Sequence, residues 1–316
     1  MKNSLYILLC LMSVACGSDA DNRSEPVAIS RIDLFISEGI GSADSLQPGL
    51  DLYLHVMELD SLTQEEALVR LENSDVTRVF GTDIKSRFTA ADSLSVPLGN
   101  ALMRLGHLLP DLDIVKVYGV ASPYMQSVIV GDSAVLVALN HYLGADYPGY
   151  ASMPAYMVSQ KVPARIVPDV VEALVRVNYP YEPVDGTLIE RMLYEGAVTK
   201  AVAMALGGDI GQAMGYTRSQ LDVAVGHEGE AWNALAVGRM LYSRSPVDIS
   251  QLCNHSPFTR LGEYEYPSRM GCYIGLRIVD SYMDCHQGDV SLGYLLSPEF
   301  YGDAQSSLIK SCYNPR

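Results

Sequence analysis

The chain has 316 residues, of which 48% are hydrophobic, so it can bury a core of the size that an enzyme-like domain needs. Its 22 Lys and Arg residues against 37 Asp and Glu residues give a formal net charge of −15 at pH 7. A surface of that charge repels phosphate backbones and anionic lipid headgroups, which argues against nucleic-acid binding.

The first 16 residues have the layout of a signal peptide. Lys2 supplies a positive charge, an apolar run covers residues 5–12, and small residues precede Cys16. A cysteine at this place is typical of lipoprotein processing, in which the thiol is acylated and the chain is cut before it, although Ser13 stands where an aliphatic residue is usual. We expect residues 1–16 to be a lipoprotein signal and Cys16 to carry the lipid; the alternative is an ordinary secretory signal.

Residues 17–30 are polar and acidic and show no apolar periodicity. We expect them to form a flexible tether between the lipid and the folded part, which leaves residues 31–316 as a single domain. No second apolar stretch has the length of a membrane span, so membrane contact is expected through the anchor. These features predict an outer-membrane lipoprotein that faces the periplasm or the cell surface.

The first part of the expected domain is predicted to mix strands and helices. Residues 31–39 alternate in polarity and include β-branched side chains, which predicts a first strand. Apolar residues at helical spacing predict helices within 51–74, where Thr63 and Glu66 match the capping-box pattern of a helix start. The domain is therefore expected to begin with a strand that leads into helices.

The next segments predict the rest of a small sheet. Residues 93–112 have helical spacing and are expected to form a helix that stops near Pro110. Residues 113–122 predict a strand, and two apolar runs around Gly131–Ser133 predict a β-hairpin with a tight turn. A turn-rich loop is expected over 147–163.

The remaining half is predicted to be mostly helical. Apolar residues recur at helical spacing, Gly207 marks the end of one helix, and Thr217 can cap the start of another. The predicted helices cover 165–177, 187–206, 216–225, 229–242, 271–286 and a short stretch within 297–312, with a loop over 245–271. The expected fold class is α+β, mostly helical, with a small mixed sheet and a β-hairpin followed by helices.

Four cysteines lie beyond the first 16 residues, all in the C-terminal part: Cys253, Cys272, Cys285 and Cys312. In an oxidising envelope an even number of cysteines predicts two disulfides, for which three connectivities are open. A zinc site is the rival interpretation, but no Cys-x-x-Cys spacing occurs. Buried free thiols are a third possibility.

Five blocks of the sequence carry a family resemblance, in order along the chain: residues 139–150, 192–202, 215–221, 255–283 and 306–316. Together these blocks resemble the gliding motility lipoprotein GldB family of Bacteroidetes. The resemblance implies an envelope lipoprotein associated with the gliding machinery and, in many relatives, with the type IX secretion apparatus. Asn140 and Leu276 depart from the family pattern, in which an aspartate and a tryptophan are expected.

The family also looks distantly similar to gluzincin-type zinc peptidases, which implies a zincin-like core. In those enzymes a His-Glu-x-x-His helix is followed by a helix that supplies a glutamate ligand, and Glu195 stands at the corresponding place here. No His-Glu-x-x-His occurs in this chain, and the polar candidates on the preceding helix are Asp169 and Glu172, three residues apart on one face. The zincin-like core is therefore expected to be degenerate, without a metal, a cofactor or catalytic residues.

Two further residues belong to the candidate cleft by resemblance. Arg269 and Tyr273 are similar to residues that face the substrate in gluzincin-like relatives. The alternative is ordinary packing, because an arginine in a turn followed by a tyrosine on an amphipathic helix is common. The six histidines are scattered and none pairs with another at ligand spacing, so they favour core or surface roles.

These observations favour a non-enzymatic lipoprotein that binds a peptide or partner segment in a degenerate cleft. Its expected partners are the outer membrane, through the lipid anchor, and proteins of the gliding or secretion machinery. A metal-dependent hydrolase that uses the carboxylates of Asp169, Glu172 and Glu195 is the alternative, since three carboxylates suit a harder ion than zinc. A plain structural lipoprotein without a functional cleft is the third hypothesis.

Overall fold

The computed structural model describes residues 26–89 and 92–315. The expected signal peptide, Cys16 and residues 17–25 of the expected tether lie outside the described residues. None of the described helices combines the length and the apolar character that crossing a membrane requires.

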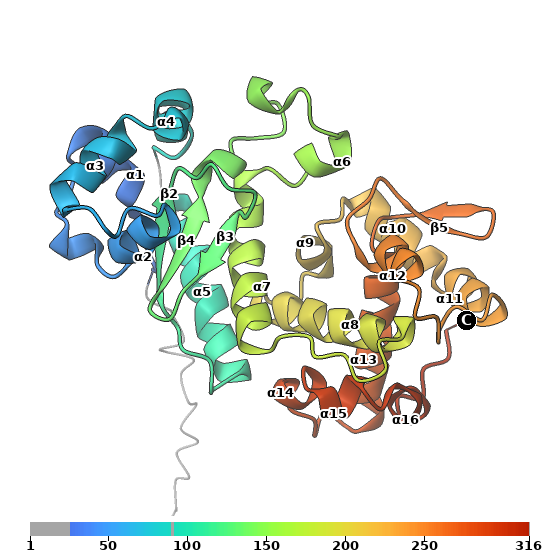
Figure 1. Ribbon diagram of the computed structural model, residues 1–316. Helices are drawn as coiled ribbons and strands as arrows, with labels where there is room; N and C mark the ends of the chain where they lie inside the picture. Colours follow the sequence, from blue (N-terminus) through green and yellow to red (C-terminus); the bar gives the residue numbers. More distant parts are fainter. Residues whose placement is uncertain (1–25, 90–91, 316) are drawn as a thin grey trace, which may run out of the picture.

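A small mixed sheet forms the centre of the N-terminal half, with strand order β1-β2-β4-β3 (Figure 1). Strand β1 (Ser30–Arg31) pairs in parallel with β2 (Lys116–Val120), which pairs in parallel with β4 (Ala134–Ala138). Strand β3 (Val128–Val130) runs antiparallel to β4 and forms the edge of the sheet. The strand predicted within 113–122 and the hairpin predicted around Gly131–Ser133 are thus present, and the α+β class is confirmed.

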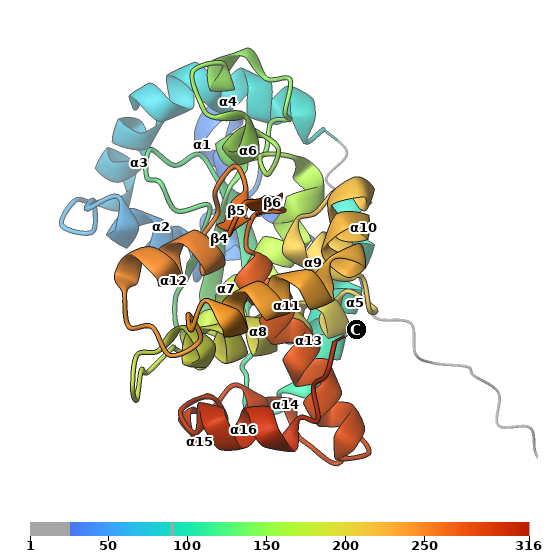
Figure 2. The same ribbon diagram turned by 90° about the vertical axis from the view of Figure 1, so that its right-hand side faces the viewer.

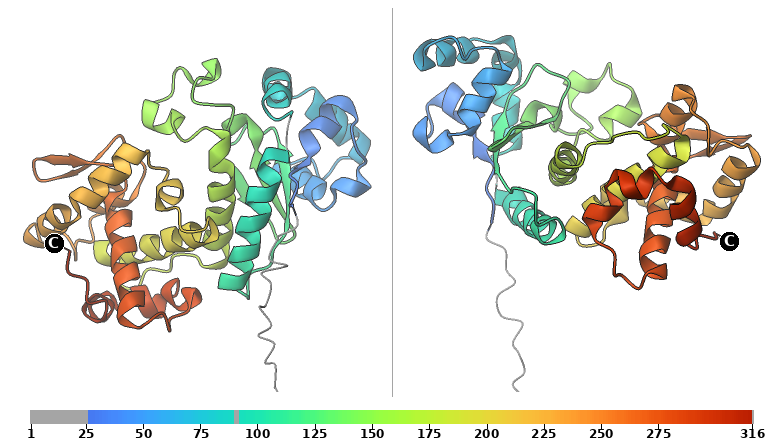
Figure 3. Two further views of the ribbon diagram at one scale, coloured as in Figure 1. Left: turned by 180° about the vertical axis from the view of Figure 1, so that it is seen from behind. Right: turned by 60° about the horizontal axis from the view of Figure 1, so that its bottom comes forward.

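The two faces of the sheet bury different helices because side chains alternate along each strand. Tyr118 and Leu136 belong to one buried cluster with α1 (Ile32–Glu38), α2 (Gly49–Val56) and α3 (Gln64–Glu72). Val117 and Val137 point the other way, into a larger cluster that contains helices of the C-terminal half. That cluster also includes buried residues of α4 (Asp75–Arg87), α5 (Asp92–Leu108) and α7 (Ile166–Asn178), and Figure 3 shows α5 lying against the sheet.

The strand predicted over 31–39 is wrong beyond its first residue. Only Ser30 and Arg31 pair with β2, and the chain then turns into α1. Ile32 and Ile36 are four residues apart, and both are buried in the cluster with α2 and α3. Burial of this helical stripe decides the conformation of a segment whose local β-propensity pointed the other way.

Two long helices, α8 (Leu188–Ala205) and α13 (Met270–Cys285), cross in the centre of the C-terminal half. A Cβ on Gly275 would lie 1.8 Å from the carbonyl oxygen of Met192, so only glycine lets the two backbones approach this closely. Helices α14 to α16 gather at one end of the molecule, below α13 (Figures 1 and 2). The remaining helices are α6 (Ala155–Val158), α9 (Ile210–Met214), α10 (Arg218–Gly226), α11 (Glu228–Val237), α12 (Pro246–Cys253), α14 (Leu292–Leu295), α15 (Pro298–Tyr301) and α16 (Ala304–Lys310).

The loop predicted over 245–271 contains regular structure. Ser245 caps α12 by accepting a hydrogen bond from the Asp248 N–H, and Pro246 occupies the first helical position, where its missing N–H costs nothing. The antiparallel strands β5 (Thr259–Leu261) and β6 (Tyr264–Tyr266) then form a hairpin whose turn includes Gly262 at a φ of 61°. The prediction missed these elements because each is short and polar residues interrupt it.

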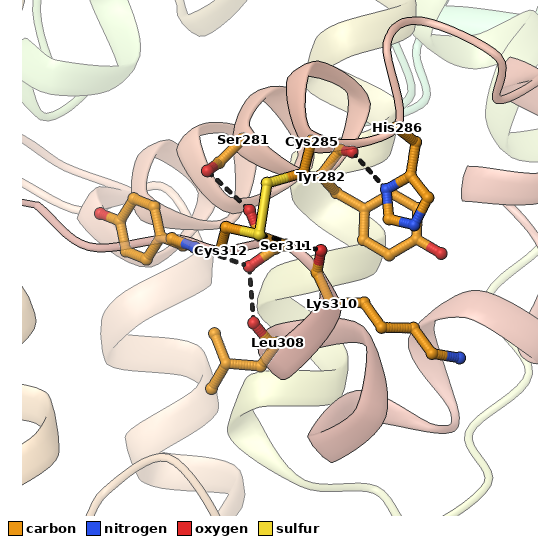
Figure 4. Close-up of a disulfide and its surroundings, with 9 residues drawn as sticks. Ser281, Tyr282, Cys285, His286, Leu308, Lys310, Ser311 and Cys312 are labelled. Carbon is orange, nitrogen blue, oxygen red and sulfur yellow. Dashed lines mark hydrogen bonds between the residues drawn. A yellow bond between two sulfur atoms is a disulfide. The ribbon is translucent and has the colours of Figure 1, made fainter.

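The four C-terminal cysteines differ in state, contrary to the expectation of two bridges. Cys285 at the end of α13 and Cys312 after α16 form a disulfide, beside which the Ser281 hydroxyl donates to the Ser311 carbonyl (Figure 4). Cys253 and Cys272 are free and buried, and the Cys272 thiol donates to the Cys253 carbonyl at 3.3 Å. The bridge ties the C-terminal segment to α13, whereas the other two cysteines fill the α12–α13 contact as thiols.

Candidate functional site

Three neighbouring pockets lie side by side between the sheet half and the C-terminal helices, and Gln160 lines all of them. We call them together the central cleft. The first pocket, of about 230 Å³, is lined by Tyr142 and Asp169; the second, of about 50 Å³, is lined by Arg269; the third, of about 590 Å³, is lined by Arg165. The central cleft therefore brings residues of α7 close to the start of α13.

Helix α7 presents one charged stripe. Arg165 just before the helix and Asp169, Glu172 and Arg176 within it are spaced by four, three and four residues, which places them on one side of the helix. The opposite side carries fully buried apolar residues such as Val170. The amphipathic pattern that folds α7 against the core thus also aligns two carboxylates and two guanidinium groups.

Asp169 is held by two partners at the floor of the first pocket. Arg165 Nη2 lies 2.6 Å from Asp169 Oδ1, and the Tyr142 hydroxyl donates to Asp169 Oδ2 at 2.9 Å. Burial raises the pKa of the Asp169 carboxyl, and this effect outweighs the charge of Arg165, which lowers the pKa. Both oxygens of this carboxylate are therefore engaged inside the protein.

Glu172 and Glu195 share one guanidinium. Arg176 Nε donates to Glu172 Oε1 at 2.9 Å, and Arg176 Nη2 donates to Glu195 Oε2 at 2.6 Å. Arg191, on the same helix as Glu195, binds the second oxygen of Glu195 at 2.8 Å. Burial alone would raise the pKa of Glu172, but the charges of Arg176 and Arg269 outweigh it and lower that pKa to about 2.

The structure thus brings the three predicted carboxylates Asp169, Glu172 and Glu195 into neighbouring ion pairs with arginine. Asp169 lines the central cleft, whereas Glu172 and Glu195 do not line its three pockets. Within the described part of the chain, no group of three or more His, Cys, Asp or Glu side chains is arranged to hold a metal ion. The sequence interpretation missed Arg165 and Arg176, although both stand four residues from a carboxylate on α7, the spacing of a helical ion pair.

Arg269 and Tyr273 separate in the structure. Arg269 precedes α13 and lines the second pocket, with 4% of its surface exposed and a φ of 63°. Tyr273, one turn later, is buried away from the three pockets, and its hydroxyl donates to Glu228 Oε2 at 3.3 Å. Glu228 also binds Arg277 at 3.1 Å, so Tyr273 belongs to a different polar cluster.

His141 in the wall of the first pocket gives the protein a pH dependence. Its Nδ1 lies 3.0 Å from Ser127 Oγ, and burial, followed by the charge of Lys161, lowers the pKa of His141 to about 4. In the unfolded chain a histidine titrates near pH 6.5, so the unfolded state takes up the proton first as the pH falls. The stability that depends on the neutral ring is therefore complete above pH 6.5 and is lost towards pH 4.

We expect the free energy of unfolding to fall between pH 7 and pH 5 by about 2 kcal/mol more in the wild type than in His141→Gln. Urea unfolding at the two pH values measures the difference. The matched control is His107→Gln on the exposed surface of α5, which should retain the wild-type difference. An equal drop in the wild type and His141→Gln would contradict the assignment.

Comparison with known proteins gives one match. A family model described as the gliding motility protein GldB matches residues 26–315, a range that includes every residue that the structure describes. No curated protein and no solved structure matches the chain. The chain therefore belongs to the GldB family and is a gliding-motility-related lipoprotein of the cell envelope.

Proposed function

We propose that the protein is an outer-membrane lipoprotein, anchored through Cys16, that supports gliding motility and type IX protein secretion by binding a peptide segment of a partner protein. The segment binds in the central cleft and is not hydrolysed. Proteins of the gliding or secretion machinery are the partners that family membership favours.

The observation that carries this proposal is the pairing of Asp169, Glu172 and Glu195 with arginines. Glu172 and Arg176 stand four residues apart on α7, and Glu195 follows on α8, a spacing at which gluzincin-type peptidases carry two histidines and a glutamate around zinc. In this chain the Arg176 guanidinium lies between the two carboxylates. We interpret the arrangement as a degenerate zincin-like core in which the Arg176 cation stands where a metal ion would bind. A guanidinium has no acceptor atom and therefore cannot itself be a metal ligand.

The free edge of the sheet supports binding of an extended peptide. The Gly131 N–H donates to β4, and the Ser127 carbonyl accepts from β4. In an antiparallel pair, residues that hydrogen-bond to the partner strand alternate with residues that do not. The backbone groups of Val128 and Val130 therefore point away from β4, at the edge of the four-stranded sheet. Unpaired groups on an edge strand accept an extended segment as an added strand. Ser127, next to β3, lines the first pocket.

Site-specific photo-crosslinking in intact envelopes tests the proposal. A benzoylphenylalanine replaces Met157, which lines the first pocket, and in a separate variant it replaces Ile309, which is 71% exposed on α16 at the other end of the molecule. We expect a defined adduct from position 157 and none of the same mass from position 309. Equal adducts from both positions, or none from position 157, would contradict binding in the central cleft.

A second variant tests whether the adduct depends on the edge of the sheet. Val130→Pro removes an outward N–H while leaving the β3–β4 hydrogen bonds in place, and proline is tolerated at such positions of edge strands. We expect this variant to fold and to lose the adduct at position 157. Peptide hydrolysis by the purified protein that disappears in Glu195→Gln, together with about one bound divalent ion per chain, would instead establish the metal-dependent hydrolase.

A further inference from the structure

Arg269 is a buried cation that forms no ion-pair contact with a carboxylate among the described residues, although its charge acts on nearby Glu172. Only 4% of its surface is exposed, and its Nη1 atom has no hydrogen-bond partner. The guanidinium contacts the thiol of Cys272, which is a weak acceptor. Among the ion pairs of the described residues, none involves Arg269, whereas Arg165, Arg176 and Arg191 each form at least one. A buried charge in this condition is costly unless a partner arrives.

The lining of the central cleft carries more positive than negative groups. Four cationic side chains line its three pockets against two carboxylates, in a chain whose formal net charge is −15. The cations are Lys161, Arg165, Arg218 and Arg269, and the carboxylates belong to Asp169 and Asp209. An excess of positive charge in an acidic protein favours an anionic ligand at that place.

The backbone at Arg269 adds a second feature. Its φ of 63° lies in the left-handed region, which residues other than glycine, asparagine and aspartate rarely adopt. The conformation directs the chain from the β5–β6 hairpin into α13 and places the guanidinium against the second pocket. Strained residues of this kind cluster at ligand sites, where the surrounding fold holds them in place.

The same pocket contains an unmatched acceptor. Gln160 Oε1 is buried without a hydrogen-bond partner, while Nε2 of the same side chain donates to the Gly215 carbonyl at 3.1 Å. Gln160 and Arg269 both line the second pocket, whose volume of about 50 Å³ is enough for a small polar group. Two residues that each have one buried polar atom without a partner, a charged donor and an acceptor, therefore line a single space of about carboxylate size.

We propose that Arg269 and Gln160 form a subsite for a carboxylate of the bound peptide. Arg269 Nη1 donates to a carboxylate oxygen, and Gln160 Oε1 accepts a neighbouring backbone N–H of the same ligand. The inference rests on the proposed peptide-binding function and names the chemical group that the central cleft selects. A C-terminal carboxylate and an Asp or Glu side chain present the same group, so the test separates them.

The experiment uses the detergent-solubilised full chain with 13C-labelled methionine methyl groups. Met214 lines the second pocket, and Met125, Met153 and Met157 line the first, so their methyl resonances report binding at each place. Three probes are titrated: N-acetyl-tetraalanine with a free C-terminus, its C-terminal amide, and N-acetyl-Ala-Ala-Glu-Ala-amide. We expect at least one carboxylate probe to shift the Met214 methyl resonance and to bind about tenfold more tightly than the amide without a carboxylate.

Substitutions then assign the preference to its residues. Arg269→Gln should abolish the preference for a carboxylate probe over the amide without a carboxylate, and Gln160→Leu should weaken the binding of all probes while retaining that preference. The matched control is Arg260→Gln on β5, where Arg260 is exposed and paired with Glu265, and it should behave as the wild type. If Arg269→Gln does not fold, Arg269→Lys serves instead, since it keeps the charge but loses the paired donor geometry.

The outcomes separate this inference from the proposed function. Equal binding of the carboxylate and amide probes, with shifts of the cleft methionines, overturns the carboxylate subsite and leaves peptide binding intact. A carboxylate preference that survives Arg269→Gln also overturns it. Absence of binding by all three probes refutes the subsite, while the cross-linking at position 157 still decides the proposed function independently.

Discussion

Replacing Gly275 with alanine should lower the free energy of unfolding by about 3 kcal/mol or more, or prevent folding altogether. Gly275 lies where α13 crosses α8, and a Cβ there would lie 1.8 Å from the carbonyl oxygen of Met192. A Cβ on Gly196, on the other side of the crossing, would lie 2.2 Å from the carbonyl carbon of Gly275. The atoms in the way are backbone atoms, so the clash is relieved only by moving one helix away from the other, which opens the core between them.

Urea unfolding followed by circular dichroism measures this effect. The matched control is Gly226→Ala, because Gly226 is the last residue of α10 and a Cβ there meets nothing within 4 Å. That substitution should change the free energy of unfolding by no more than about 0.5 kcal/mol, since it adds a methyl group to an open helix end. Similar losses for Gly275→Ala and Gly226→Ala would show that the α8–α13 approach does not limit the side chain at position 275.

Glu195→Ala is the second substitution with a large expected effect. Glu195 is 2% exposed and binds two arginines, Arg176 at 2.6 Å and Arg191 at 2.8 Å. Without this carboxylate, Arg176 keeps Glu172 as an ion-pair partner, whereas Arg191 keeps none among the described residues. Both guanidinium groups remain partly buried. Breaking one partner out of a buried ionic network costs about 3–5 kcal/mol, so we expect a loss in that range.

Two comparisons make this expectation specific. Asp185→Ala breaks the ion pair between Asp185, whose side chain is 61% exposed, and Arg244, whose side chain is 67% exposed. An exposed pair of this kind contributes about 0–1 kcal/mol to the free energy of unfolding. Glu195→Gln keeps the shape and one acceptor oxygen but removes the charge, so its loss should lie between those of the other two variants. A loss of less than about 1 kcal/mol in Glu195→Ala would mean that the buried network does not hold α7 and α8 together.

The same network limits what the central cleft can do chemically. A carboxylate that acts as a base or a metal ligand needs a free oxygen, and Asp169 and Glu195 direct both of their oxygens to protein partners. The stabilising role of the arginines and the proposed binding function are therefore two consequences of one arrangement. Arg269 differs from these groups, because it forms no ion pair among the described residues and its Nη1 atom has no hydrogen-bond partner.

The sequence by itself determined most of the regular elements. Helical spacing of apolar residues predicted α7, α8 and α13, and the predicted capping box at Thr63 and Glu66 is present at the start of α3. The turn residues Gly131–Ser133 predicted the β3–β4 hairpin. These features depend on periodicity and turn chemistry within a few residues, which is information that a local stretch of sequence contains.

Only the tertiary structure decided which elements and side chains meet. Ile32 and Ile36 became one face of a helix because the cluster around α2 and α3 buries them together, whatever the local β-propensity of the segment. Arg176 reaches Glu195 across two helices, and Arg269 reaches a pocket lined by Gln160, more than a hundred residues earlier in the chain. Local spacing predicts an element and its buried face, whereas the partners of that face follow from the packing of the whole chain.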